Sequence, residues 1–221
     1  MRYLFIDYGA THIKSCTYDN QEDTFSKLQK SKCPENLYKQ QRHEISIDKI
    51  AKITQGIINN ASFDAVYICS QMHGFCLLSA DGQLSDYISW KDETGEVFSH
   101  PEFNKKTGLT AHKGLPVFNI GSTAKRLGFK DYRVLTLPEA VLYLIGSFYN
   151  KTHATMACGL GVYDINNREI IPDFENILYG SPVFNKIVYD IDVAGIITKD
   201  KKEKPVYTPV GDMQCALYGV G

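Results

Sequence analysis

The stretch that decides the fold is YLFIDYGATHIK, residues 3–14. Its first four residues are apolar, with aromatic and β-branched side chains on both faces, which is typical of a central strand covered on both sides. This strand ends on Asp7, and Gly9 follows where a tight reversal needs a permissive backbone. Residues 13–18 then alternate as a returning strand does, so the stretch predicts a β-hairpin.

The tip of this hairpin carries a carboxylate, a hydroxyl and exposed backbone amides. Successive N–H groups in a turn form a concavity that binds anions, and the Thr11 hydroxyl can donate to a phosphate oxygen. The Asp7 carboxylate is the hard oxygen ligand that Mg²⁺ prefers. The tip therefore predicts a site for a triphosphate and Mg²⁺, although an ordinary hairpin with a turn glycine and a capping aspartate explains the same residues.

Composition limits the class of protein. The 221 residues suffice for one large domain or two small ones with a real hydrophobic core. The 24 basic and 25 acidic side chains nearly balance and form no long block, which disfavours nucleic acid and membrane surfaces and favours a small polar solute as partner. The 6 cysteines form no C-x-x-C pair, as in reduced intracellular proteins. With no leader pattern and no long apolar window, we expect a soluble cytoplasmic protein.

Helical and strand patterns alternate along the rest of the chain. Ser46 is a candidate N-cap, and isoleucines recur at helical spacing from Ile47 to Ile58, which predicts a helix ending at residues 59–60. Residues 65–69 form a buried strand, so a mixed sheet with helices against it is expected. The other expected elements are strands over 24–28, 75–78, 87–90 and 161–165, helices over 122–127 and 139–145, and loops with a short helix over 91–121.

Several motifs follow one another in an order that resembles one family. They are DYGATHIK (7–14), SQMHGFCLLSADGQL (70–84), ISWKDET (88–94), Leu137-Pro138, THATMACGLGVYD (152–164) and GDMQCALYGVG (211–221). Together they resemble the FGGY carbohydrate kinases of the actin-like ATPase superfamily, and the Gln-Met-His-Gly segment resembles the xylulokinase-like branch. Six weak motifs in the family's order make chance convergence improbable.

The resemblance implies an α/β fold with the RNase-H-like N-terminal domain of the actin-like ATPases: a mixed sheet with an antiparallel three-strand meander and flanking helices. Residues 1–211 then correspond to the sugar-binding domain, and residues 212–221 to the start of the adenosine-binding C-terminal domain. The family's kinases are about twice as long, so we expect the 221-residue chain alone to be inactive. Whether the chain is a truncated or a natural short product stays open.

For the phosphoryl-transfer chemistry, the resemblance implies ATP and Mg²⁺ as cofactors. Asp212 corresponds to the catalytic base, which accepts the proton of the attacking sugar hydroxyl. Asp7, Gly9, Thr11 and Lys14 correspond to the phosphate motif, with Asp7 organising Mg²⁺ through water. An N-cap role for Asp212 is compatible with the catalytic one, because a helix N-terminus also keeps a carboxylate ionised.

For the sugar, a ketose or related polyol, the resemblance implies Gln71, Met72, His73, Trp90 and Asp92 as binding residues. Amide, imidazole and carboxylate groups supply the donors and acceptors that a polyol needs, and Met72 or Trp90 can face its carbon skeleton. We expect His73 and Asp92 to lie close to Asp212, and Asp7 and Asp212 to face one cleft.

The sequence departs from the family's pattern at a few places. Ala10 replaces one threonine of the phosphate motif, no arginine follows Asp92, His153 replaces an aspartate, and Met213 stands where an amide side chain often follows the base. A non-catalytic sugar-binding or regulatory module is the alternative function. A dinucleotide site is disfavoured because no G-x-G-x-x-G follows a strand. A homo-oligomer stays possible.

Overall fold

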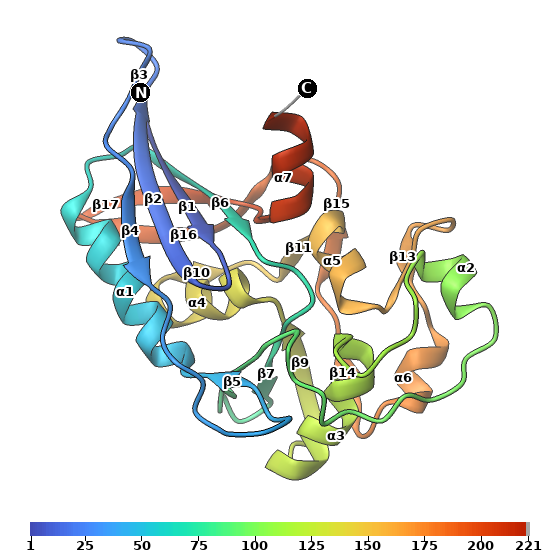
Figure 1. Ribbon diagram of the computed structural model, residues 1–221. Coiled ribbons are helices and arrows are strands. Elements are labelled where there is room, and N and C mark those ends of the chain that lie inside the picture. The colour runs from blue at the N-terminus through green and yellow to red at the C-terminus, as the bar shows by residue number, and fades with distance from the viewer. Residues whose placement is uncertain (220–221) are drawn as a thin grey trace.

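A mixed sheet of nine strands organises the structure, a computed structural model that describes residues 1–219 (Figure 1). The strand order is β10-β16-β17-β6-β1-β2-β3, with β18 also paired to β6 and β4 also paired to β2. The nine strands are β1 (Arg2–Tyr8), β2 (His12–Asp19), β3 (Thr24–Phe25), β4 (Gln29–Lys32), β6 (Ala65–Ser70), β10 (Ser147–Phe148), β16 (Val193–Lys199), β17 (Lys202–Tyr207) and β18 (Val210–Gly211).

The first hairpin forms as the sequence predicts. β1 runs antiparallel to β2 and parallel to β6, and both β17 and β18 run parallel to β6. The predicted third strand over 24–28 is interrupted, since β3 and β4 both pair with β2 but the register advances by one residue between them. One extra residue in the outer strand is a β-bulge. The mixed sheet with an antiparallel meander is thus confirmed, with a bulge in its third strand.

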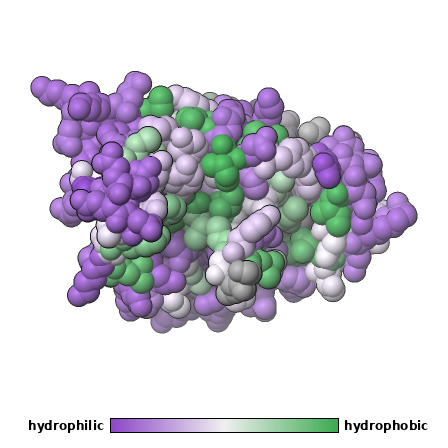
Figure 2. Space-filling view, turned by 90° about the horizontal axis from the view of Figure 1, so that it is seen from above, coloured by the Kyte–Doolittle hydropathy of each residue, from purple (hydrophilic) through white to green (hydrophobic). Residues whose placement is uncertain are grey.

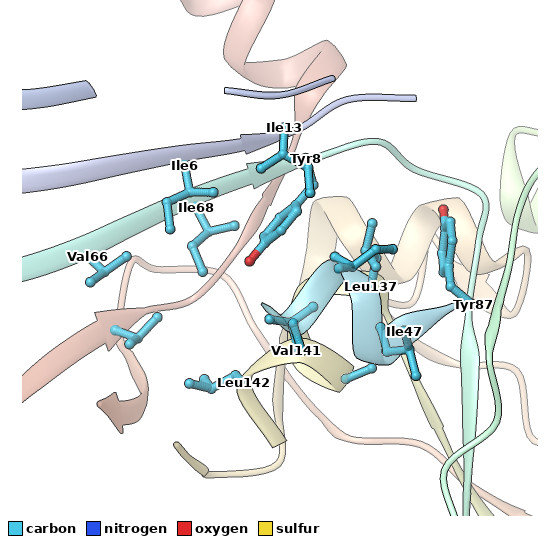
Figure 3. Packing of buried hydrophobic residues seen from close by; sticks show 14 of the residues in the cluster. Ile6, Tyr8, Ile13, Ile47, Val66, Ile68, Tyr87, Leu137, Val141 and Leu142 are labelled. Atoms are coloured by element: carbon cyan, nitrogen blue, oxygen red, sulfur yellow. The ribbon is translucent and has the colours of Figure 1, made fainter. Parts of the chain in front are cut away.

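The covered face of the sheet packs on helices α1 (Ile47–Asn60) and α4 (Leu137–Ile145). Figure 3 shows Ile6, Tyr8 and Ile68 pointing from the strands toward residues of these two helices. The predicted cap of α1 is confirmed, because the Ser46 hydroxyl accepts a hydrogen bond from the backbone N–H of Lys49. This core therefore supports β1 and β6, whose ends carry Asp7 and Ser70, from one face of the sheet.

A second apolar core lies beside the sheet, around the three strands β7 (Cys76–Ser79), β9 (Asp131–Leu135) and β14 (Ser181–Val183). The sequence also predicts that residues 75–78 and 87–90 form a hairpin, and the two segments do pair: Phe75 and Ile88 exchange both backbone hydrogen bonds, and Leu78 forms an antiparallel bridge with Leu84. Each segment also pairs on its other side, β7 with β9 and the strand over 87–88 with residues 44–45. The helices around this core include α3 (Pro116–Leu127), of which the predicted helix over 122–127 is the second half.

The remaining elements are short. They are β5 (Glu44–Ile45) with β8 (Tyr87–Ile88), β11 (Lys151–His153) with β15 (Lys186–Val188), β12 (Tyr163–Asp164) with β13 (Glu169–Ile170), and helices α2 (Phe103–Thr107), α5 (Ala154–Leu160), α6 (Asp173–Ile177) and α7 (Asp212–Gly219). The strand expected over 161–165 is therefore only two residues long, at 163–164. None of the helices described within residues 1–219 has the length and apolar character needed to cross a membrane.

The opposite face of the sheet carries a row of aromatic side chains. Phe5 stacks on Tyr67, and Tyr67 stacks on Tyr207 with 4.6 Å between ring centroids. A mostly apolar hollow of about 350 Å³ lies on this face and extends to Asp7 and Cys215. Seen from above, hydrophobic residues gather in the middle of the molecule with hydrophilic residues around them (Figure 2). This face leads directly to the edge where β1 and β6 end.

Candidate active site

Three neighbouring parallel strands end at one edge of the sheet. Asp7 near the end of β1 pairs with Cys69 of β6, and Val210 of β18 pairs with the same Cys69 from the other side. Asp212 follows β18 directly and begins α7. Because ligands in α/β folds bind beyond the carboxyl ends of strands, this edge is the place to look for chemistry. Asp7 and Asp212 lie there with one strand between them.

The carboxylate of Asp7 is held by two side chains from the adjacent strands. The ammonium group of Lys14 lies 2.9 Å from its Oδ2, and the thiol of Cys69 donates to its Oδ1 at 3.4 Å. The hydrogen bond to Asp7 raises the pKa of Lys14. The side chain of Asp7 remains 30% exposed, so the carboxylate is oriented by its neighbours but open to a ligand.

The hairpin tip between β1 and β2 is exposed. The backbone N–H of Gly9 donates to the carbonyl oxygen of His12 at 3.1 Å. A Cβ at Gly9 would lie only 3.0 Å from that same oxygen, so the tight reversal favours glycine. The Thr11 hydroxyl lies 3.2 Å from the Nδ1 of His12, and both residues are exposed. The tip therefore offers a hydroxyl and turn amides next to Asp7.

Asp212 is a half-buried carboxylate whose surroundings favour its protonated form. Burial raises the pKa of Asp212, the N–H of Met213 bound to Oδ1 at 2.9 Å lowers it, and the negative charge of Asp7 raises it again. Protonation of His73 would act in the opposite direction and lower the pKa of Asp212. Asp7, His73 and Asp212 are therefore close enough to influence one another's charge, which makes the group a candidate for proton transfer.

His73 is fixed by its backbone and by one hydrogen bond. Its φ of 59° lies in the left-handed region, which is uncommon for a residue with a side chain and is often found at functional sites. Its Nδ1 lies 2.9 Å from the carbonyl oxygen of Gly159, and because a carbonyl only accepts, Nδ1 carries the proton. Burial lowers the pKa of His73, so the ring is neutral at pH 7 and its Nε2 can accept a hydrogen bond.

Two glutamine side chains at this edge have buried polar atoms without a partner among the described residues. These are the Nε2 of Gln71, a donor, and the Oε1 of Gln214, an acceptor. The two segments touch, since a Cβ placed on Gly211 would lie 2.4 Å from the Oε1 of Gln214 and 2.8 Å from the Sδ of Met72. Buried polar groups in native proteins are almost always satisfied. An unpaired donor and an unpaired acceptor here point to a ligand with hydroxyl groups.

The loop that carries Trp90 and Asp92 is arranged differently. Trp90 is 44% exposed, with the Lys91 ammonium group 5.4 Å from its ring centroid. Asp92 is only 1% exposed, and its carboxylate accepts hydrogen bonds from the N–H groups of His43 and Thr94 and from the Thr94 hydroxyl. The structure therefore encloses Asp92 within its own loop. Its role as a sugar ligand stays a prediction, and so does the predicted proximity of Asp92 to Asp212.

Sequence reasoning missed several groups at the edge. Gln214 lies in the first turn of α7, two residues after Asp212. Only its position near Asp212 in the predicted helix could have indicated it. Cys69 could have been found from the strand pairing but not from its residue type. His112, whose charge lowers the pKa of His73, comes from a segment that the sequence showed only as loop.

No protein-family model and no curated protein matches the chain. Solved structures do match it. The chain is similar to a ligand-bound xylulose kinase from Lactobacillus acidophilus, with a TM-score of 0.82 and 18% identity over 99% of this chain and 50% of that chain. It is also similar to a gluconate kinase from the same organism (TM-score 0.79, 19% identity, 96% and 48%) and to Plasmodium falciparum glycerol kinase with ADP (TM-score 0.81, 16% identity, 99% and 50%).

The chain has a carbohydrate-kinase fold. The expected fold class is confirmed, and the structural neighbours are the sugar kinases that the motifs had indicated. The chain spans about half the length of the solved structures that it matches. Within the carbohydrate-kinase fold of this chain, the polar groups described above gather at the ends of β1, β6 and β18.

Proposed function

We propose that these 221 residues form the sugar-binding half of an ATP-dependent carbohydrate kinase, which phosphorylates a hydroxyl of a ketose or related polyol. One observation carries the proposal. Asp7 and Val210 pair with the same residue of β6, Cys69, from its two sides, and Asp212 follows β18 directly, so two carboxylates lie at one edge of the sheet. The fold shared with sugar kinases supports it. The retained pair of carboxylates favours a kinase over a non-catalytic sugar-binding module.

In the proposed reaction, a sugar hydroxyl oxygen attacks the γ-phosphorus of ATP. The bond from that phosphorus to the bridging oxygen breaks, ADP leaves with the electron pair, and the hydroxyl proton passes to the carboxylate of Asp212. The raised pKa of Asp212 makes this carboxylate a stronger base than an aspartate in water. Positioning and charge neutralisation supply most of the remaining catalysis in such transfers.

The residues at the edge fit ATP and Mg²⁺. Within residues 1–219 no three His, Cys, Asp or Glu side chains gather in a metal cluster, and Mg²⁺ in kinases is usually held by one or two carboxylates, waters and phosphates. When bound, Mg²⁺ would neutralise phosphate charge. Asp7 would hold it through water, because Lys14 and Cys69 already contact both carboxylate oxygens. The Gly9 and Thr11 tip and Lys14 would face the phosphates.

We expect the sugar hydroxyl groups to form hydrogen bonds with the unpaired polar atoms at the sheet edge. Its hydroxyls both donate and accept, so one can accept from the Nε2 of Gln71, another can donate to the Oε1 of Gln214, and a third can donate to the Nε2 of His73. The buried Met72 would offer an apolar contact to the carbon skeleton, and the exposed Trp90 would cover it from the loop.

The same proposal assigns residues 1–211 to the sugar-binding domain and 212–221 to the start of an adenosine-binding domain. Val220 and Gly221 lie outside the described residues. Helix α7 exposes Met213, Leu217 and Tyr218 by 56%, 66% and 90%, which supports a packing partner for this helix. We therefore expect sugar binding without measurable phosphoryl transfer from these residues alone, in a protein of the cytoplasm.

Calorimetric titration of the 221-residue chain with xylulose, gluconate and glycerol tests the proposal. We expect saturable binding of one of these, weakened about tenfold by Asp212→Asn because a charge-assisted hydrogen bond is lost. Asp200→Asn, at an exposed turn, is the matched control and should bind as the wild type does. Absence of binding for all three sugars, or equal binding by Asp212→Asn, contradicts the proposal. A coupled assay with ATP and Mg²⁺ should show no turnover.

A further inference from the structure

A second cavity lies away from the sheet edge that carries Asp7 and Asp212. It has a volume of about 630 Å³ and opens between helix α1 and the outer strands β2 and β4. It reaches Arg2 and Leu4, at the opposite end of β1 from Asp7. Figure 1 shows α1 and β4 side by side. We call this cavity the α1 groove.

The strand side of the α1 groove is polar where a sheet normally packs on a helix, whereas Ile53 and Ile57 make the helix side partly apolar. Ile13 of β2 belongs to the apolar core, but Ser15 and Thr17, the next residues on the same face, line the groove. On β4, Gln29 and Ser31 line it as well, and they pair with Ser15 and Ile13. A sheet face that covers a helix is expected to be apolar. These hydroxyl and amide groups are instead available to something in the groove.

The charged side chains that line the α1 groove are all cations. Its lining contains the cations Arg2, Lys27 and Lys52 and no aspartate or glutamate. The guanidinium of Arg2 is held by Asp19 at 3.0 Å, whereas neither lysine has a carboxylate partner among residues 1–219. Lys27 comes from the strand side and Lys52 from α1. Cations on two walls of a concave surface concentrate positive potential inside it.

Gly56 gives an independent indication. It lies inside α1 and lines the groove, and a Cβ added to it would meet no atom within 4 Å. Glycine within a helix is unfavourable relative to alanine, so a packing need would be the usual explanation for it. No such contact exists here among the described residues. The glycine leaves open space at the floor of the groove between Lys52 and Asn60, where a ligand could approach the helix backbone.

We propose that the α1 groove binds a small phosphorylated polyol at a site separate from the sheet edge. Lys27 and Lys52 bind the phosphate from the two walls, with charge-assisted hydrogen bonds. Ser15, Ser31 and Gln29 bind the hydroxyl groups of the polyol, and the open floor at Gly56 receives its carbon skeleton. Because Lys27 and Lys52 are both exposed cations, the lining favours an anionic ligand over a neutral sugar.

Calorimetric titration of the 221-residue chain with glucose 6-phosphate, inorganic phosphate and glucose tests this site. Glucose 6-phosphate should bind saturably, phosphate more weakly and glucose not measurably. The double variant Lys27→Gln/Lys52→Gln should weaken glucose 6-phosphate binding by roughly tenfold or more. Lys49→Gln, an exposed lysine one turn away on α1 that does not line the groove, should bind as the wild type does. Equal binding by the double variant, or equal losses in both variants, overturns the site.

Gly56→Ala separates a ligand role from a structural one. It should raise the melting temperature of the free protein, because alanine favours the helix, and it should weaken glucose 6-phosphate binding. A lower melting temperature, or unchanged binding, contradicts the proposal. Asp212→Asn distinguishes the α1 groove from the sheet edge, since it should leave glucose 6-phosphate binding unchanged even if the proposed kinase function is wrong. Loss of binding in Asp212→Asn would place the ligand at the edge and refute the groove.

Discussion

The sheet edge at residues 70–74 and 211–214 and the loop at residues 88–94 both carry predicted site residues, yet their polar groups are used differently. At the edge, Gln71 and Gln214 have buried polar atoms that find no partner within residues 1–219, and Asp212 is half-exposed with a raised pKa. In the loop, Asp92 is enclosed and accepts hydrogen bonds from its own loop and from His43. The difference teaches that residue type alone does not identify a ligand-binding side chain. The hydrogen bonds that the side chain already makes within the protein decide whether it can bind a ligand.

The largest expected effect of a substitution is a loss of folding stability when Asp92 of the loop is replaced. Asp92→Ala removes a buried carboxylate that accepts from the half-buried N–H of His43 and from the N–H of Thr94, so the free energy of unfolding should fall by about 2 kcal/mol or more. Asp212→Ala should change it by less than about 1 kcal/mol, because this carboxylate is half-exposed and mainly favours the helix N-terminus. Urea unfolding followed by circular dichroism measures both. Similar losses in the two variants would remove the distinction between loop and edge.

Glu139 extends the comparison to a third carboxyl group. It is 1% exposed, and burial raises its pKa to about 7 although Thr152, the Thr136 N–H and Asn185 all donate to it. A folded-state pKa above the unfolded value of 4.5 means that the folded protein binds an extra proton between these values. Stability should therefore fall by on the order of 3 kcal/mol as the pH rises from about 4.5 to above 7.

The control for this pH dependence is Glu139→Gln. The amide has no charge, and its nitrogen can donate to the Thr152 hydroxyl, so the variant should fold with a flatter stability profile over the same pH range. Urea unfolding at several pH values measures the profile. A profile as steep as that of the wild type would show that another group is responsible.

The smallest expected effect concerns Gln71. Gln71→Leu replaces an unpaired buried amide by an apolar group of similar size, so stability should rise by about 1 kcal/mol. The same change should weaken sugar binding about tenfold, because one hydrogen bond to the ligand is lost. Thermal unfolding and calorimetry measure the two effects. A loss of stability would mean that the amide has a structural partner, and the edge would then resemble the loop.

The fold could be predicted where the sequence pattern is local. The hairpin after β1, the Ser46 cap and the helix begun by Pro138 all depend on residues within a few positions of one another. Strands of two or three residues, such as β14 and β18, could not be predicted, because their partners rather than their own residues define them.

The candidate site was predictable to a similar extent. Asp7, His73 and Asp212 follow strands or begin a helix, so their place at one edge followed from the order of elements. The enclosure of Asp92 depends on His43, 49 residues away along the chain, and no local pattern reveals such a contact. The open acceptor of Gln214 depends in the same way on how α7 meets the segment after β6.

The most direct measurement is chemical-shift mapping by NMR, with the sugar that binds best added to the 221-residue chain. The account predicts that the backbone amides of residues 71–74 and 211–214 shift on binding, while those of residues 91–94 change little and those of residues 52–56 stay in place. Shifts confined to the loop around Asp92 or to α1, with none at the ends of β6 and β18, would contradict it.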